Sequence, residues 1–202
     1  MVGCEDGKHY KLAARLGCGN GEKKKILKIF EGEERTRIMQ NNFLEELVAE
    51  WLEYNGYIVK RNERVGRRER GGYEGELDIV AFNPVTNHLT HVEAEGGAAS
   101  WDYREKSFKR KFATGDRYIK ALFEGLTIPD EIEKKAILYG SNRNHRTIGG
   151  GQVVPAKDYL LEILRKLKTT SFMSRVVPEK YPILRILQMV THYWKYFVEE
   201  LK

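Results

Sequence analysis

The chain has 202 residues, 41% of them hydrophobic, which is enough for a real core, and its formal net charge is +6 at pH 7. Its 2 cysteines do not make a disulfide framework, and no apolar stretch approaches the length that crosses a membrane. Because the N-terminus lacks the apolar core of a signal peptide, we expect a cytoplasmic protein, and its positive charge favours a polyanionic partner.

Three regions are expected along the chain. Residues 1–38 are rich in Lys, Gly and Glu with weak periodicity, and they are interpreted as an N-terminal arm or extension. Residues 39–150 carry the alternation of helical and strand patterns that a core domain needs. Residues 151–202 predict a C-terminal helical part that packs on this core.

The first half of the core predicts a helix followed by strands. Apolar residues at helical spacing predict a helix from Asn42 to Asn55. A strand starts at Tyr57, and the Arg- and Gly-rich residues 64–75 predict an exposed connection. Two further strands, at residues 76–82 and 89–95, are separated by a turn and predict a hairpin.

The second half of the chain is mainly helical. A long helix is expected over residues 101–123, with Gly115 as a point where it can kink or split. A compact strand at residues 136–139 and a polar loop at residues 141–151 follow, and then come two amphipathic helices near residues 156–168 and 182–201. The order predicts an α/β fold with a central mixed sheet of four to five strands flanked by helices.

Carboxylates interrupt two apolar strands that lie close together in the sequence. Asp78 follows Leu77 on the second strand, while Glu93 and Glu95 alternate with small apolar residues on the third and therefore share one face with His91. Clustered carboxylates repel one another unless a cation or a proton neutralises them. Oxygen ligands of this kind suit a hard divalent ion such as Mg²⁺.

The order of helix, three strands, helix and strand, with Asp on the second strand and Glu-x-Glu on the third, resembles the PD-(D/E)xK nuclease superfamily, the restriction-endonuclease-like phosphodiesterases. The resemblance covers roughly residues 42–141. It implies a restriction-endonuclease-like core in which Asp78 and Glu93 hold Mg²⁺, for which Mn²⁺ is expected to substitute. It also implies an acid on the first helix, Glu45 with Glu46 as the alternative, and a coordinating carbonyl at Ala94.

Glu95 stands where this family most often has lysine. The resemblance therefore implies that Glu95 is a third metal ligand or the general base. Alternatively, a lysine from the following helix, such as Lys106 or Lys109, reaches the phosphate in its place. The sequence leaves both possibilities open.

Basic residues precede and follow the acidic strands. Residues 60–70 hold six basic residues against two acids, and residues 101–120 hold seven against three. Each run alone is typical of a solvated face, but together they indicate a track for a phosphate backbone. The candidate nucleic-acid-binding residues are Arg61, Arg64, Arg67, Arg68, Arg70, Lys106 and Lys109.

The sequence thus favours a Mg²⁺-dependent DNA endonuclease of the restriction-endonuclease class, with Glu45, Asp78, Glu93 and Glu95 as catalytic residues. A homodimer is expected because cutting both strands usually takes two sites, and no membrane partner or organic cofactor is expected. Two alternatives remain: a repair or Holliday-junction-resolving nuclease, and a non-catalytic nucleic-acid-binding module with a degraded site. A third alternative is a scaffold or interaction protein in which the acidic cluster is only a metal-stabilised feature.

Overall fold

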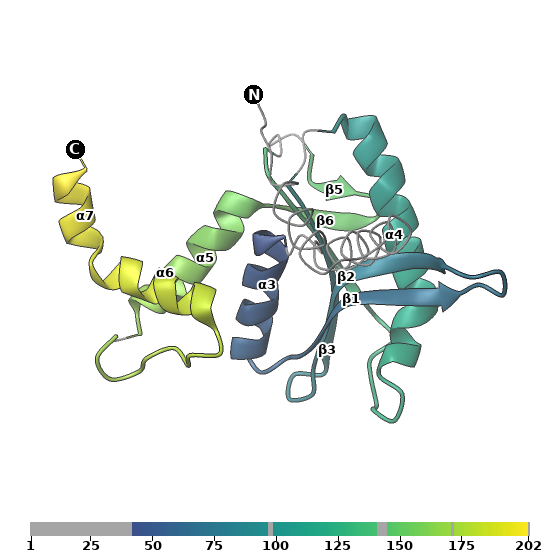
Figure 1. Ribbon diagram of the computed structural model, residues 1–202, viewed down its shortest axis with the longest axis horizontal. Helices are drawn as coiled ribbons and strands as arrows, with labels where there is room; N and C mark the ends of the chain where they lie inside the picture. The colour runs from purple at the N-terminus through teal and green to yellow at the C-terminus, as the bar shows by residue number, and fades with distance from the viewer. Residues whose placement is uncertain (1–41, 97–98, 141–144, 171, 202) are drawn as a thin grey trace, which may run out of the picture. The chain divides into compact units, whose positions relative to one another are not determined.

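The computed structural model describes residues 42–96, 99–140, 145–170 and 172–201. The expected N-terminal arm, residues 1–38, lies outside this range. In chain order the elements are α3 (Phe43–Tyr54), β1 (Ile58–Arg67), β2 (Tyr73–Asn83), β3 (His88–Glu95), α4 (Trp101–Leu122), β4 (Glu133–Leu138), β5 (Thr147–Ile148), β6 (Gly151–Pro155), α5 (Ala156–Lys168), α6 (Pro182–His192) and α7 (Trp194–Glu200) (Figure 1).

The strands form one mixed sheet in the order β1-β2-β3-β4-β6-β5. The β3–β4 and β4–β6 pairs are parallel, and the other three pairs are antiparallel. The α/β class is confirmed, but the sheet has six strands where four to five were expected. The polar segment expected to be a loop holds β5, which is only two residues long, and a tight turn at Gly149 and Gly150, both at positive φ, leads into β6. A strand that short shows no alternation in the sequence.

Helices cover both faces of the sheet (Figure 1). On one face, Val92 and Ala94 of β3 belong to a buried apolar cluster with residues of α3, α5 and α6. On the other face, residues of α4 such as Phe112 and Ile119 pack against the sheet. Because side chains alternate along β3, His91, Glu93 and Glu95 are on the α4 side.

Helix α3 forms where the sequence predicts it. The Asn42 side chain caps the helix by accepting a hydrogen bond from the Leu44 amide at 3.2 Å. Gly56, at a φ of +85°, follows the last residues of the helix and allows the chain to turn into β1. The helix buries Leu47 and Val48 against the sheet, which fixes the direction of its polar faces.

The β1–β2 hairpin is longer than the sequence predicts. Residues 64–75 were expected to be an exposed connection, but Val65 pairs with Gly75 and Arg67 with Tyr73, and only residues 68–72 make the turn. Val65 is buried against residues of α4, which extends the pairing beyond the sheet centre. The arginines of this segment therefore lie on a paired strand and its turn.

Two helices also differ from expectation. Helix α4 is continuous through Gly115, so the helix does not split there. The expected helix at residues 182–201 divides at Tyr193 into α6 and α7. Within the described residues, no helix combines the length and apolar character that a membrane span requires.

Candidate active site

Asp78 of β2 and Glu93 of β3 lie side by side on neighbouring antiparallel strands. The Asp78 amide donates to Glu93 Oε1 at 3.4 Å, and the Ala94 amide donates to Asp78 Oδ2 at 3.1 Å. The Glu93 side chain is fully buried and that of Asp78 is 12% exposed. The backbone thus holds two carboxylates together at a site largely shielded from water.

Lys111 of α4 joins these two carboxylates. Its Nζ lies 3.0 Å from both carboxylate oxygens of Asp78 and also donates to Glu93 Oε2. The sequence analysis named Lys106 and Lys109 as lysines that could reach the site from this helix, but both are exposed. The signal that identifies Lys111 is its position three residues after buried Phe108 and four before buried Gly115, which places it on the sheet-facing side.

The protonation states of Asp78, Glu93 and Lys111 depend on one another. Burial, helped by the charge of Glu93, raises the pKa of Asp78 to about 8. Burial alone would raise the pKa of Glu93 too, but the hydrogen bond from His91 and the Lys111 charge outweigh it and lower the pKa to about 2. Burial opposes the charge on Lys111, but the charges of Glu93 and Asp78 prevail and raise its pKa. The two carboxylates therefore share one proton up to mildly alkaline pH.

His91 lies behind Glu93 rather than in the cleft. Its ring is fully buried, with Nε2 2.7 Å from Glu93 Oε1, and it packs edge-on against Phe112 with the ring centroids 5.2 Å apart. A Cβ at Gly115 would be only 2.4 Å from His91 Nδ1. Gly115 is therefore the residue that admits the imidazole beneath α4, which explains a glycine inside a continuous helix.

Of the two candidate acids on α3, Glu45 is the one near the pair. Burial raises its pKa; a hydrogen bond from Asn42 and the charge of Lys111 act in the opposite direction. Glu46 instead forms an ion pair with Arg61, whose other nitrogen lies 2.7 Å from Glu53. Of the two, Glu45 is therefore the acid whose charge is coupled to Lys111 and Glu93, while Glu46 is held by Arg61.

Glu95 does not join the pair. Its carboxylate is 29% exposed and lies 3.5 Å from Arg104 Nε of α4. Among the described residues, no three Asp, Glu, His or Cys side chains converge in an arrangement that could hold a metal. The expected ligand set of Asp78, Glu93 and Glu95 is therefore reduced to two converging carboxylates, with Glu45 nearby.

The remaining donors still fit a hard cation. Mg²⁺ commonly takes one or two protein carboxylates and completes its shell with water and substrate phosphate oxygens. Asp78 and Glu93 supply those carboxylates, while the Ala94 carbonyl accepts a hydrogen bond from Asn42 Nδ2 at 3.2 Å. Because Lys111 Nζ already bridges the two carboxylates, a metal there would displace it toward the cleft.

A cleft of about 290 Å³ opens in front of Asp78, between β2 and α4. Acidic residues of β2, Glu74 and Glu76, line one side, and Arg110 and Lys111 of α4 line the other. An anionic polymer entering this cleft meets cationic side chains from α4 directly beside the carboxylate pair.

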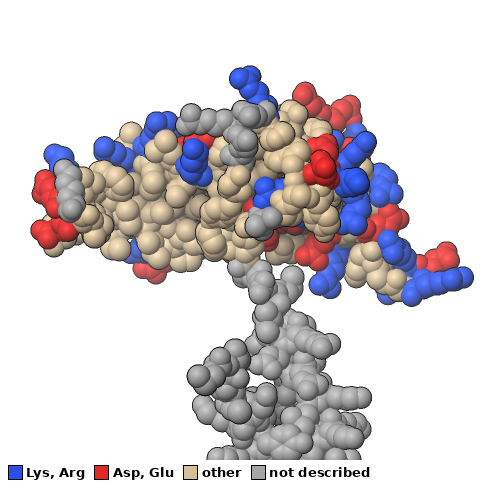
Figure 2. All heavy atoms as spheres, turned by 90° about the horizontal axis from the view of Figure 1, so that it is seen from above, with Lys and Arg blue, Asp and Glu red and all other residues tan. Residues whose placement is uncertain are grey.

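The candidate nucleic-acid-binding arginines divide into those paired with acids and those at the hairpin end. Arg61 pairs with the two acids of α3, and Arg64, which is exposed, lies 3.1 Å from Glu76. Arg67, Arg68 and Arg70 are exposed at the end of the β1–β2 hairpin. Figure 2 shows Lys and Arg side chains, interspersed with Asp and Glu, at the right of the view. This is the side on which α4 and the β1–β2 hairpin lie in Figure 1.

Comparison of the sequence with protein-family models and with curated proteins finds no match. Any functional inference therefore rests on the positions and charges of these side chains.

Proposed function

We propose that the protein is a metal-dependent DNA endonuclease of the restriction-endonuclease class, built on a restriction-endonuclease-like core and acting in the cytoplasm. The observation that supports this most is the meeting of Asp78, Glu93 and Lys111 from two neighbouring strands and the following helix. In the PD-(D/E)xK family that the sequence resembles, two acids and a lysine form such a site. Here α4 supplies the lysine because Glu95 occupies its usual strand position.

Each side chain has a distinct task in phosphodiester hydrolysis. Asp78 and Glu93 would hold Mg²⁺ or Mn²⁺, which supplies a more acidic bound water and stabilises charge on the phosphate oxygens. His91 keeps Glu93 ionised and oriented through its hydrogen bond at 2.7 Å. Lys111 presents its ammonium group to the phosphate, where negative charge builds up. Glu45 orients water near the pair.

The substrate reaches this site along cationic surfaces. Arg110 lines the cleft beside Lys111, and Lys106 and Lys109 are exposed on the same helix. The hairpin arginines add a second set of contacts that track the backbone without reading bases. Two active sites are needed to cut both strands, so we propose a homodimer. Helix α7, with no buried residue and with Trp194 49% exposed, is its candidate surface.

One observation favours a second function. Lys111 already neutralises the two carboxylates, and no third acid converges with them in the described part of the chain. A nucleic-acid-binding module with a degraded nuclease site would have these properties. Such a module binds DNA with strong salt dependence but does not cut it.

The test is cleavage of supercoiled plasmid and of a four-way junction by the purified protein with Mg²⁺, Mn²⁺ or EDTA. We expect metal-dependent cutting that is lost in Asp78→Asn and retained in Asp130→Asn, whose side chain is 98% exposed. Preference for the junction would indicate the resolving nuclease instead of the restriction class. If the wild type and both variants bind DNA in a salt-sensitive way but none of them cuts it, the nuclease proposal is contradicted and the degraded module is supported.

A further inference from the structure

A second cavity lies on the face of the sheet away from Lys111. It measures about 440 Å³ and lies between α3, α5 and the strands β3, β4 and β6. Thr90 and Val92 line it, and they alternate along β3 with His91 and Glu93, which face α4. The cavity is therefore separate from the candidate active site. Its size is in the range of pockets that enclose small organic molecules, about 300 to 1,000 Å³.

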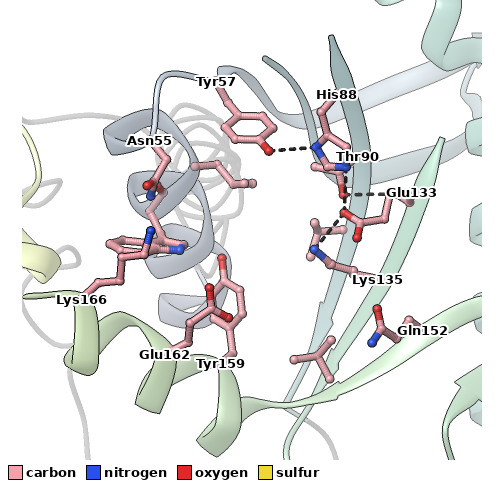
Figure 3. A pocket seen from close by; sticks show the side chains of 14 residues that line it. Asn55, Tyr57, His88, Thr90, Glu133, Lys135, Gln152, Tyr159, Glu162 and Lys166 are labelled. Carbon is pink, nitrogen blue, oxygen red and sulfur yellow. Dashed lines mark hydrogen bonds and ion pairs between the residues drawn. The ribbon is translucent and has the colours of Figure 1, made fainter. Parts of the chain in front are cut away.

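One wall is a chain of hydrogen bonds and ion pairs. The Tyr57 hydroxyl lies 2.8 Å from His88 Nδ1, and His88 Nε2 lies 3.2 Å from Glu133 Oε2 (Figure 3). Lys135 Nζ lies 2.8 Å from the same Glu133 oxygen. A Tyr57 hydroxyl that donates to His88 Nδ1 keeps its own oxygen as an acceptor. The Tyr57 oxygen can then accept a hydrogen bond from a ligand N–H.

The opposite wall belongs to α5, whose Tyr159, Glu162 and Lys166 line the cavity (Figure 3). Within the described residues, neither Glu162 nor Lys166 forms an ion pair, and the Tyr159 hydroxyl has no hydrogen-bond partner. Tyr159 is nevertheless only 9% exposed. Burial, with the nearby charge of Glu162, raises the pKa of Tyr159, so its hydroxyl remains a donor.

The side chains that line the cavity can bind a ligand that combines an anionic group, N–H donors and a planar ring. Lys166 can bind an anion, while Glu162 and the Tyr57 oxygen accept from N–H groups. The Gln152 side chain on β6 can both donate and accept. Trp51, Tyr57 and Tyr159 provide aromatic surface for a planar ring.

We propose that this cavity binds a nucleoside monophosphate. The base offers a flat ring with N–H and carbonyl groups to the polar lining, and the phosphate pairs with Lys166. Glutamine carries an ammonium group for Glu162 and a carboxylate for Lys166, but it has no flat ring and leaves much of the cavity unfilled. This site does not depend on the proposed nuclease activity.

The test is isothermal titration calorimetry of the whole chain in EDTA with GMP, AMP, UMP, ribose 5-phosphate and glutamine. At least one nucleotide is expected to bind with a Kd below about 1 mM, and ribose 5-phosphate about tenfold more weakly or worse, because it lacks the base. Lack of nucleotide binding at millimolar concentration, or tighter binding of glutamine, overturns the proposal.

Variants locate the binding. Lys166→Ala and Glu162→Gln are expected to weaken the best nucleotide by about tenfold or more, because each removes a charge-assisted contact. Lys157→Ala is the matched control, since Lys157 is exposed on the same helix and does not line this cavity. Asp78→Asn should leave the affinity unchanged. Binding that Asp78→Asn alters and Lys166→Ala does not would place the nucleotide in the other cleft and overturn the proposal.

Discussion

The imidazole of His91 is fully buried beneath α4, and its Nε2 lies 2.7 Å from Oε1 of Glu93, which is itself fully buried. A carboxylate without solvent needs a proton, hydrogen-bond donors or a nearby positive charge. His91 from behind and Lys111 from the cleft side provide these partners, and they hold the pKa of Glu93 at about 2. The charged state of this site is therefore determined by residues of β3 and α4 together.

Replacing His91 by Phe keeps an aromatic ring but removes the donor to Glu93. We expect the free energy of unfolding to fall by about 3 kcal/mol, because a buried carboxylate loses one of its partners. Urea unfolding at neutral pH measures this change. His192→Gln, at an exposed histidine, should cost less than about 0.5 kcal/mol. Equal stability of the His91 variant and the wild type would show that the hydrogen bond contributes nothing.

Gly115→Ala tests the packing of the same imidazole. Alanine is the better helix former by about 1 kcal/mol, so helix propensity alone predicts stabilisation. The new Cβ would lie 2.4 Å from His91 Nδ1, and we expect net destabilisation of about 2 kcal/mol from overpacking. Thermal unfolding measures it, and in a His91→Ala background, where the clashing ring is absent, the Gly115→Ala change should cost little or nothing. A more stable Gly115→Ala protein would contradict this geometry.

Lys111→Met removes the cation that bridges Asp78 and Glu93 while keeping the apolar part of the side chain. We expect plasmid cleavage to fall at least about 100-fold, because the developing phosphate charge loses its stabilising partner. Lys109→Met, two residues away and exposed, is the matched control and should retain most of the activity. If the two variants cut equally well, the helix lysine has no catalytic part and Glu95 becomes the stronger candidate.

The raised pKa of Asp78 predicts how stability depends on pH in the metal-free protein. In the unfolded chain this carboxyl loses its proton near its ordinary pKa of 3.8, while in the folded protein it keeps the proton to about pH 8. The folded state binds more protons over this interval, so stability falls as pH rises from about 5 to 8, by up to about 1.4 kcal/mol per pH unit.

Asp78→Asn removes this titration. Urea unfolding in EDTA at several pH values should therefore show a flatter profile for the variant between about pH 5 and 8. Asp130→Asn, at the 98% exposed control position, should keep the wild-type slope. Identical slopes for Asp78→Asn and the wild type would mean that Asp78 is already ionised at neutral pH.

The parts of the site that the sequence predicts are those fixed by local pattern. Alternation along β3 and the position of Asp78 after buried Leu77 suffice to bring two acids together, because neighbouring strands align them. The choice of Lys111 over Lys109 depends on how α4 rotates against the sheet. In that rotation Gly115 lies against His91, a tertiary contact that no sequence window contains.

The partner of Glu95 is another feature that the sequence alone could not predict. Strand alternation places it on the face of Glu93, and the sequence cannot distinguish a ligand from a side chain held elsewhere. In the structure Arg104 of α4, 3.5 Å away, binds it at the end of the strand. The long β1–β2 hairpin was missed for a related reason: Arg and Gly residues are typical of loops, and only the burial of Val65 against residues of α4 extends the pairing.

The arginines at the end of this hairpin give the last prediction. Replacing Arg67, Arg68 and Arg70 together by Ala should weaken DNA binding at all sequences alike, because exposed arginines here contact phosphates and not bases. If all three bind phosphates, the slope of log K against log salt should fall by up to about 2.7, since each neutralised phosphate contributes about 0.9. Fluorescence anisotropy across a salt series measures both quantities. The control replaces Lys157, Arg165 and Lys168, exposed residues of α5 with the same total charge, and should leave the slope unchanged. If both triple variants lost the same affinity and the same slope, the hairpin arginines would contribute only net charge. The DNA contacts would then be assigned to α4.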